Sequence, residues 1–342
     1  MSSQTVVPDE AESPRKERKI GLWGASGSGK TSFLAALYVA VTENTADWRI
    51  IGDNRASVDF LTEMTKSMTQ HHVFPKKTEG IQKLSWTMVG QTERIVGRRF
   101  RKKKETVPLR FRLDLIDAQG RLLAGMDRAD DLNLDFGETR AMKTPKTEAD
   151  QLIEELAACD GLVYLFDPLR ERSDRKLEDG DDFQHFQWAL QNIAHICDKN
   201  GTFDTHLPHY LAVCITKLDD PLVFRTADEL GYLTADTQDP YLFPRVVPGR
   251  TEELYLKLGS TSPTRSALKV HDSIRRYFHE DRVRYFATSS IGFYVPPGAT
   301  RFRRANFRNV VPDSEKSTVI RGDIHPINVL EPLLWLGDVV SR

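Results

Sequence analysis

The sequence predicts an α/β protein whose sheet is doubly wound and mainly parallel, with one antiparallel hairpin at its edge. Three observations predict this fold. A short apolar run at residues 20–23 is followed by a glycine-rich loop and then by a helical pattern. Apolar runs at residues 162–167, 210–215 and 283–287 alternate with amphipathic stretches, as expected of parallel strands joined by helices. Residues 109–115 alternate apolar and charged side chains, and a second candidate strand around residues 84–88 completes a hairpin.

The glycine-rich loop reads Gly-Ala-Ser-Gly-Ser-Gly-Lys-Thr over residues 24–31, which fits G-x-x-x-x-G-K-[ST]. Glycines allow such a loop to curl until its backbone N–H groups point inward. These donors and the N-terminus of the following helix favour a polyphosphate. The motif predicts that Lys30 reaches the β- and γ-phosphates and that the Thr31 hydroxyl binds Mg²⁺. The predicted phosphate-binding residues are Gly24, Ser26, Gly27, Ser28, Gly29, Lys30, Thr31 and Ser32.

A second polar segment, residues 117–120, follows the alternating strand and fits D-x-x-G. A carboxylate at the end of a strand can hold Mg²⁺ through water, and Asp117 has that position. Gly120 has no side chain to keep its backbone N–H from a γ-phosphate. Because Asp and Gly are common in turns, this motif gains weight only from its place downstream of the glycine-rich loop.

Two further segments concern the base. The apolar run at residues 210–215 leads into Thr216, Lys217 and Asp219. Guanine offers two donors, N1–H and the exocyclic amine, that one carboxylate can accept together, whereas adenine lacks this pair. Asp219 is therefore predicted to select guanine, with the Lys217 stem lying along the base. After the run at residues 283–287, Ser289 and Ser290 are predicted to bring a backbone N–H near the guanine O6.

Together these four segments resemble the G1, G3, G4 and G5 boxes of the Ras-like and translation-factor-like P-loop GTPases, over about residues 18–295. The resemblance implies a Ras-like G domain that binds GTP or GDP with Mg²⁺ and hydrolyses GTP, with Lys30 as a catalytic residue. It also implies a switch I threonine before the second strand, as a catalytic residue and Mg²⁺ ligand. Thr78 is the candidate by position, and Thr87 and Thr92 are weaker rivals.

The chain departs from the family pattern at two positions. Thr216 stands where the family has an asparagine that ties this box to the phosphate loop. Arg121 stands where Ras-like enzymes carry the glutamine that orients the attacking water, and Gln119 is a possible substitute. Since orienting that water and supplying an arginine are large parts of the rate, we expect slow intrinsic hydrolysis.

Three functions therefore remain open. The first is a GTP-hydrolysing switch that signals to a protein effector, with or without a GTPase-activating partner. The second is a pseudo-GTPase that holds guanine nucleotide without turnover, and the third is a P-loop ATPase, which Asp219 disfavours. Within the class, the chain resembles the bacterial double-GTPase-like proteins of signalling and conflict gene clusters.

Composition excludes several other classes. The 48 basic and 49 acidic residues give a formal charge of -1, so no overall charge attracts nucleic acid or membrane. No apolar run approaches the ~18 residues of a membrane span. The three cysteines, Cys159, Cys197 and Cys214, lack C-x-x-C spacing and are predicted to be buried, reduced thiols of a cytoplasmic protein.

Along the chain, residues 1–17 are predicted to be a disordered leader and residues 18–342 one elaborated G domain. Insertions are expected at about 45–77 and 222–281, and a C-terminal extension at about 296–342. Helical spacing is seen within residues 58–68, 151–157, 183–197 and 266–278. Two basic stretches stand out. The run from Arg98 to Lys104 is a candidate contact for an anionic partner, although a solvated hairpin tip is favoured. Residues 301–308 mix cations with phenylalanines, and inward packing is favoured, so nucleic acid is not the expected partner.

Overall fold

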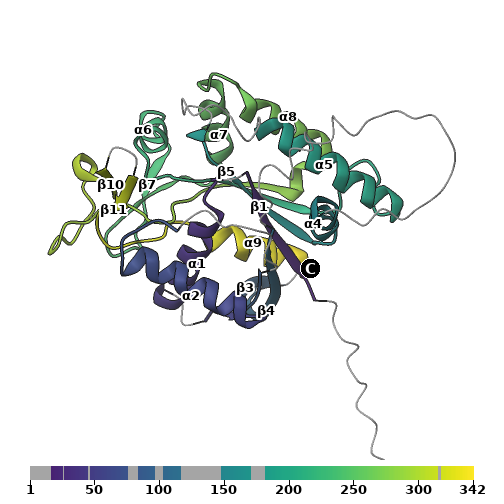
Figure 1. Cartoon of the computed structure of the whole chain (residues 1–342), viewed down its shortest axis with the longest axis horizontal. Coiled ribbons are helices and arrows are strands. Elements are labelled where there is room, and N and C mark those ends of the chain that lie inside the picture. Colours follow the sequence, from purple (N-terminus) through teal and green to yellow (C-terminus); the bar gives the residue numbers. More distant parts are fainter. Residues whose placement is uncertain are drawn as a thin grey trace, which may run out of the picture.

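The computed structural model describes residues 17–25, 27–44, 47–75, 84–96, 103–116, 148–170, 182–314 and 317–342. Within these ranges the chain forms a seven-stranded sheet with the strand order β2-β3-β4-β1-β5-β6-β9. Helices cover both faces of this sheet (Figure 1). No helix of the described part combines the length and the apolar character needed to cross a bilayer.

The centre of the sheet is parallel, as the sequence predicts. Strand β1 pairs in parallel with β4 on one side and β5 on the other, and β6 and β9 continue the parallel order. Every residue of β5 is buried, because helices cover this central strand on both faces. The bounds of the parallel strands are Lys19–Gly24 (β1), Lys103–Leu115 (β4), Gly161–Phe166 (β5), Tyr210–Ile215 (β6) and Val283–Ala287 (β9).

The predicted antiparallel hairpin is also confirmed. Strand β3, Leu84–Val96, pairs with β4 over its full length, from Leu84 opposite Leu115 to Val96 opposite Lys103. A short strand that the sequence analysis missed, β2 (Arg49–Gly52), pairs antiparallel with β3 and forms the outer edge. Of the basic run, Lys103 and Lys104 belong to β4, and Lys104 pairs with Glu93 across the hairpin at 2.7 Å. Residues 97–102 lie outside the described ranges.

Two hydrophobic cores fill the two sides of the sheet. Helices α1, α2 and α9 lie on one face, and α4, α5, α7 and α8 on the other (Figure 1). The helices predicted within residues 58–68, 151–157, 183–197 and 266–278 are therefore confirmed, although Val58 on α2 is 47% exposed rather than part of the buried stripe. Helix bounds are Lys30–Asn44 (α1), Arg55–Thr69 (α2), Glu148–Ala157 (α4), Asp182–Lys199 (α5), Pro221–Glu229 (α6), Thr251–Ser260 (α7), Ser266–Tyr277 (α8) and Glu331–Val340 (α9).

Smaller elements lie between these. The ribbon β7 (Leu233–Ala235) and β8 (Pro244–Val246) falls in the long connection before α7. A second ribbon, β10 (Val310–Ser314) and β11 (Ser317–Ile320), lies in the segment between β9 and α9. Ile320 and Ile324 of this segment share a third apolar cluster with α1 and α2. The 3₁₀ turns are Glu280–Arg282 and Arg304–Asn306.

Two packing predictions are confirmed. Phe302 and Phe307 pack against Phe224 and Phe293, so the aromatic side chains of the 301–308 segment face inward. The three cysteines are buried and free. The 301–308 segment is thus a surface loop anchored by its phenylalanines.

The order of the strands reverses at β1. The chain passes from β1 to the side of β3 and β4, and then crosses back over β1 to place β5 on its other side. In open α/β sheets, ligands bind at such a switch point, outside the carboxyl ends of the strands. The carboxyl ends of β1 and β5 therefore mark where a ligand site is expected.

Candidate functional site

Three of the four predicted motif segments are described, and they gather at one edge of the sheet. The glycine-rich loop follows β1, residues 216–219 follow β6, and residues 288–290 follow β9. Since these strands are parallel neighbours through β5, their carboxyl ends lie together. The structure adds Asp167, which follows β5.

The glycine-rich loop turns through backbone conformations that favour glycine. Gly27 and Gly29 have φ values of 76° and 95°, which L-amino acids with a side chain rarely adopt. Helix α1 begins directly at Lys30 and carries no acidic residue in its first turn, so this turn itself adds no negative charge that would repel an anion. Thr31 and Ser32 are partly buried in this turn, whereas Ser26 lies outside the described residues.

Lys30 spans the mouth of this loop. Its side chain is buried, and Nζ donates hydrogen bonds to the carbonyl oxygens of Gly24 at 2.9 Å and Ala25 at 3.1 Å. The ammonium group is therefore held beside the inward-facing surface of the loop, where it can exchange carbonyl oxygens for phosphate oxygens.

Gly24 and Ser28 show how closely this loop is packed against β5. A Cβ added at Gly24 would lie 2.8 Å from the Leu165 carbonyl oxygen and 2.8 Å from Ser28 Oγ, so only glycine fits. Ser28 is buried, and its hydroxyl has no hydrogen-bond partner among the described residues. Buried hydroxyls are normally hydrogen-bonded, so this unpaired group fits a loop built to receive a polar ligand.

Asp219 and Ser289 form the second half of the site. The Asp219 side chain is buried, and Ser289 Oγ donates a hydrogen bond of 2.5 Å to its Oδ1. Ser289 Oγ in turn accepts a hydrogen bond from the Gly292 backbone N–H at 2.8 Å. Burial raises the pKa of Asp219 to about 6, and the Ser289 hydrogen bond opposes this rise. The site thus presents a carboxylate that is desolvated yet oriented.

Thr216 ties the loop after β6 to strand β5. Its backbone N–H and its hydroxyl both donate to the Phe166 carbonyl oxygen, at 2.9 and 3.0 Å. The next link joins the Leu218 N–H to the Thr288 carbonyl oxygen at 3.0 Å. Threonine at this position therefore anchors the loop to its neighbouring strand.

Lys217 extends from this loop to Asp167. Lys217 Nζ lies 2.6 Å from Asp167 Oδ2, and Asp167 Oδ1 accepts the Leu169 N–H at 3.0 Å. Sequence reasoning did not assign Asp167 to the site. The available signal was a single carboxylate ending an otherwise apolar strand.

Six of the predicted site residues lie outside the residues that the structure describes. Ser290 is described: it is partly buried and follows Ser289 in the loop after β9. Thr78 and the D-x-x-G segment lie outside the described residues, and so does Arg121. Of the three predicted Mg²⁺ ligands, Thr31 alone is described. The described geometry therefore concerns the glycine-rich loop after β1 and the loops after β5, β6 and β9. The unplaced residues are Ser26, Thr78, Asp117, Gln119, Gly120 and Arg121.

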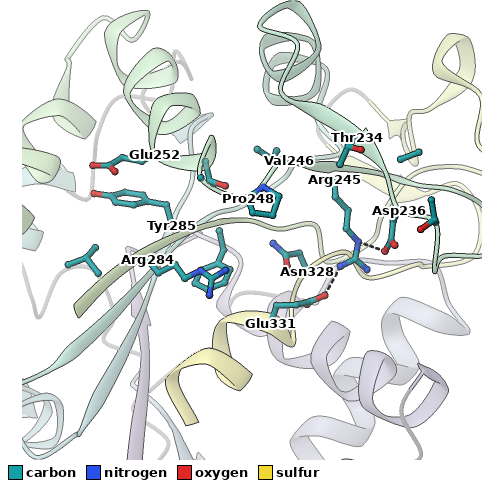
Figure 2. A pocket seen from close by; sticks show the side chains of 16 residues that line it. Thr234, Asp236, Arg245, Val246, Pro248, Glu252, Arg284, Tyr285, Asn328 and Glu331 are labelled. Atoms are coloured by element: carbon teal, nitrogen blue, oxygen red, sulfur yellow. Dashed lines mark hydrogen bonds and ion pairs between the residues drawn. The ribbon is translucent and has the colours of Figure 1, made fainter. Parts of the chain in front are cut away.

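A separate cleft of about 560 Å³ lies beside the edge strand β9, between the β7–β8 ribbon and the start of α9 (Figure 2). Arg245 crosses it and pairs with Asp236 and Glu331, each at 2.6 Å. None of the predicted site residues lines this cleft. Because its arginine is already paired with two carboxylates, the cleft has no free charge at that point to attract a nucleotide.

No family model matches the sequence, and no curated protein is significantly similar. Solved structures give loose resemblances. The Ski7 GTPase-like domain of S. cerevisiae bound to GTP has 11% identity and a TM-score of 0.36, over 95% of this chain and 50% of that chain. The SRb-GTP/SRX complex of the signal recognition particle receptor from Chaetomium thermophilum has 14% identity and a TM-score of 0.30, over 83% of this chain and 95% of that chain.

Sup35 complexed with GDP has 13% identity and a TM-score of 0.29, over 83% of this chain. The present chain spans only 40% of the Sup35 chain's length. At such low TM-scores, function has to be argued from the geometry of the site.

Proposed function

We propose that this protein binds GTP and GDP with Mg²⁺ and hydrolyses GTP as a molecular switch. The observation that carries the proposal is the buried Asp219 carboxylate, oriented by Ser289, at the same sheet edge as the glycine-rich loop. The carboxylate suits a guanine base, and the glycine-rich loop suits a polyphosphate. A single guanine nucleotide would occupy both.

At the phosphate end, the chain supplies positive charge and hydrogen-bond donors. The loop amides and the N-terminus of α1 would hold the phosphates, and the Ser28 hydroxyl would find its partner there. Lys30 would move from the loop carbonyls to the β- and γ-phosphates and stabilise the charge that develops during transfer. Mg²⁺, held by Thr31 with Asp117 and Thr78, would neutralise further phosphate charge.

At the base end, Asp219 would accept both guanine donors. An adenine would leave the buried carboxylate without those partners, which is costly in a desolvated site. This argument disfavours the ATPase alternative.

We further propose that hydrolysis is slow and that the output is a protein effector, engaged while Thr78 and the Asp117–Arg121 loop are ordered on the γ-phosphate. Gln119 or Arg121 would act on the attacking water or the developing charge. The effector role follows the resemblance to the bacterial double-GTPase-like proteins, and a cytoplasmic location follows the three cysteines without C-x-x-C spacing. Arg121 in place of glutamine also favours a second candidate, a pseudo-GTPase that retains nucleotide without turnover.

The test is multiple-turnover phosphate release by the full-length protein with GTP or ATP, with and without Mg²⁺. The proposal expects Mg²⁺-dependent release from GTP that Lys30→Ala abolishes. The control is Lys66→Ala, which removes an exposed lysine of α2. Tight GTP binding without turnover would establish the pseudo-GTPase, and preference for ATP would refute guanine recognition.

A further inference from the structure

We propose that Asp167 is a positioning residue of the base site: its carboxylate anchors the Lys217 ammonium so that the aliphatic stem lies ready along the purine. The inference rests on the proposed function and adds to it a residue outside the recognised motifs. It assigns Asp167 to affinity for the nucleotide, whereas Asp219 decides which purine is chosen.

The first support is the asymmetric burial of the ion pair. The Asp167 side chain is only 6% exposed, while that of Lys217 is 39% exposed. A carboxylate buried to this degree needs a cation, because an unpaired buried charge is strongly unfavourable. Among the described residues, Lys217 is the cation that pairs with Asp167, at 2.6 Å. The carboxylate thus holds the lysine's ammonium group, while the lysine side chain as a whole stays partly exposed.

The second support is the backbone on which Lys217 stands. Its φ of 62° is in the left-handed region, which is unfavourable for a residue with a side chain. Both flanks are pinned, by Thr216 to the Phe166 carbonyl and by Leu218 to the Thr288 carbonyl. With the backbone held and the tip anchored, the four-carbon stem has lost most of its rotamer freedom before any ligand arrives. A preorganised side chain improves affinity because its ordering cost has already been met.

The third support is where the pair lies. Asp167 follows β5, whose Leu165 carbonyl oxygen closely approaches Gly24 of the glycine-rich loop. At the same end of β5, Phe166 accepts the hydrogen bonds of Thr216 from the loop after β6. Asp167 therefore stands between the loop that would hold the phosphates and the loop that would hold the base.

Contact between an alkyl stem and a purine face does not distinguish guanine from adenine. Loss of Asp167 is therefore expected to weaken the binding of all purine nucleotides by a similar factor. It should leave the preference for GDP over ADP unchanged, since that preference depends on Asp219.

The experiment measures GDP and ADP dissociation constants of the full-length protein by calorimetry for wild type, Asp167→Asn, Lys217→Met and the double variant. Asp167→Asn keeps an acceptor for the Leu169 N–H but removes the charge. We expect it to weaken GDP binding up to about tenfold, because the lysine side chain then has to be ordered when the nucleotide binds. In the Lys217→Met background the same change should have no effect, because the two residues act through each other. A merely structural role of Asp167 would give the same loss in both backgrounds and would overturn the inference.

The matched control is Asp160→Asn, which removes a carboxylate just before the amino end of β5. Asp160 pairs with Arg18 at 3.0 Å and accepts the Lys19 N–H at 2.9 Å, far from the motif segments along the strand. This variant should bind GDP like wild type. If Asp167→Asn does not fold, Lys217→Arg against Lys217→Met provides the test, since arginine retains the pair and should bind GDP more tightly than methionine. Equal affinity of the two overturns the inference.

Failure of the proposed function would give a different result. If the wild-type protein binds neither GDP nor GTP, guanine-nucleotide binding itself is refuted. If wild type and Asp167→Asn bind GDP with equal affinity, only the role of Asp167 is refuted.

Discussion

In the proposed function individual side chains set the nucleotide specificity, and Asp219 is the most direct of them to test. Asp219→Asn replaces one acceptor oxygen with an amide donor, and xanthine presents a C2 carbonyl where guanine has an amine. We therefore expect the variant to bind GDP about 100-fold more weakly and XDP more tightly than wild type, because mismatched buried polar groups are costly. Dissociation constants for GDP, XDP and ADP check this. An unchanged ratio of GDP to XDP affinity would show that Asp219 does not face the base.

The raised pKa of Asp219 also predicts a pH dependence. Guanine donors require the ionised carboxylate, and burial raises the pKa of this group to about 6. GDP affinity should therefore fall as the pH drops through 6, with about tenfold weaker binding at pH 5 than at pH 7.5. The folding stability of the nucleotide-free protein should change with pH in the opposite direction. Because the folded-state pKa of Asp219 is raised, ionisation of this carboxyl lowers the free energy of unfolding as the pH rises through about 6. This loss is absent at pH values below the pKa of Asp219 in the unfolded chain.

Ser289→Ala provides the matching variant. The Ser289 hydroxyl favours the ionised form of Asp219, so its loss should raise the pKa of that carboxyl and move the binding midpoint to higher pH. Asp219→Asn, titrated in parallel, corrects for protonation of the phosphates. A midpoint identical in wild type and Ser289→Ala would separate the pH dependence from Asp219.

Among the secondary-structure elements, those with a strong hydrophobic pattern were predictable. Strands β5 and β6 are continuous apolar runs, and α5 and α8 have helical spacing. Strand β2 has four residues and β7 and β8 three each, too short to show a period. Helix α7 was missed because Pro244, Pro248 and Gly249 before it indicate an irregular stretch. Its burial against β9 and α8 overrides that local signal.

The loop after β9 depends on a glycine that the sequence did not single out. Gly292 has a φ of 66°, and a Cβ there would lie 2.0 Å from the His325 carbonyl oxygen. Gly298 has a similar φ of 78°, but a Cβ there meets nothing within 4 Å. We expect Gly298→Ala to lower the free energy of unfolding by about 1 kcal/mol and Gly292→Ala by about 3 kcal/mol.

The Gly292 variant should also weaken GDP binding, because the Gly292 N–H bonds to Ser289 Oγ and so supports the Asp219 contact. Urea unfolding and GDP titration of both variants check the prediction. Equal losses at the two glycines would show that the approach of His325 is not what this turn requires.

Across the entire chain, the sequence places the motif segments at strand ends but not their side chains against one another. Asp219 meets Ser289 across 70 residues, and Asp167 meets Lys217 across 50. A repeating pattern along the chain reports local structure, whereas these pairs depend on which strands become neighbours. The order of the strands was therefore predictable in outline. The contacts that orient the Asp167 and Asp219 carboxylates were not, because they depend on β5, β6 and β9 being neighbours in the sheet.

The C-terminal helix links this site to the stability of the fold. Leu333 and Leu336 of α9 are fully buried against the sheet, and the preceding segment pairs Ile327 with Ser289 through two backbone hydrogen bonds of 2.8 and 3.0 Å. Leu336→Ala should lower the free energy of unfolding by about 3 kcal/mol, the cost of a large-to-small change in a packed core. Leu334→Ala, at a partly buried position of the same helix, is the control and should cost less.

Urea unfolding followed by fluorescence and circular dichroism tests this directly. Because α9 packs on strands β4, β1, β5 and β6 at once, both probes should report one transition that shifts to lower urea in Leu336→Ala. GDP at 100 times its dissociation constant should add about 2.7 kcal/mol to the wild type, since a ligand that binds only the folded chain stabilises it by mass action. An early transition confined to helical signal, with the rest of the curve unchanged, would instead show that α9 detaches alone. The loop after β9 would then keep its structure without the C-terminal helix.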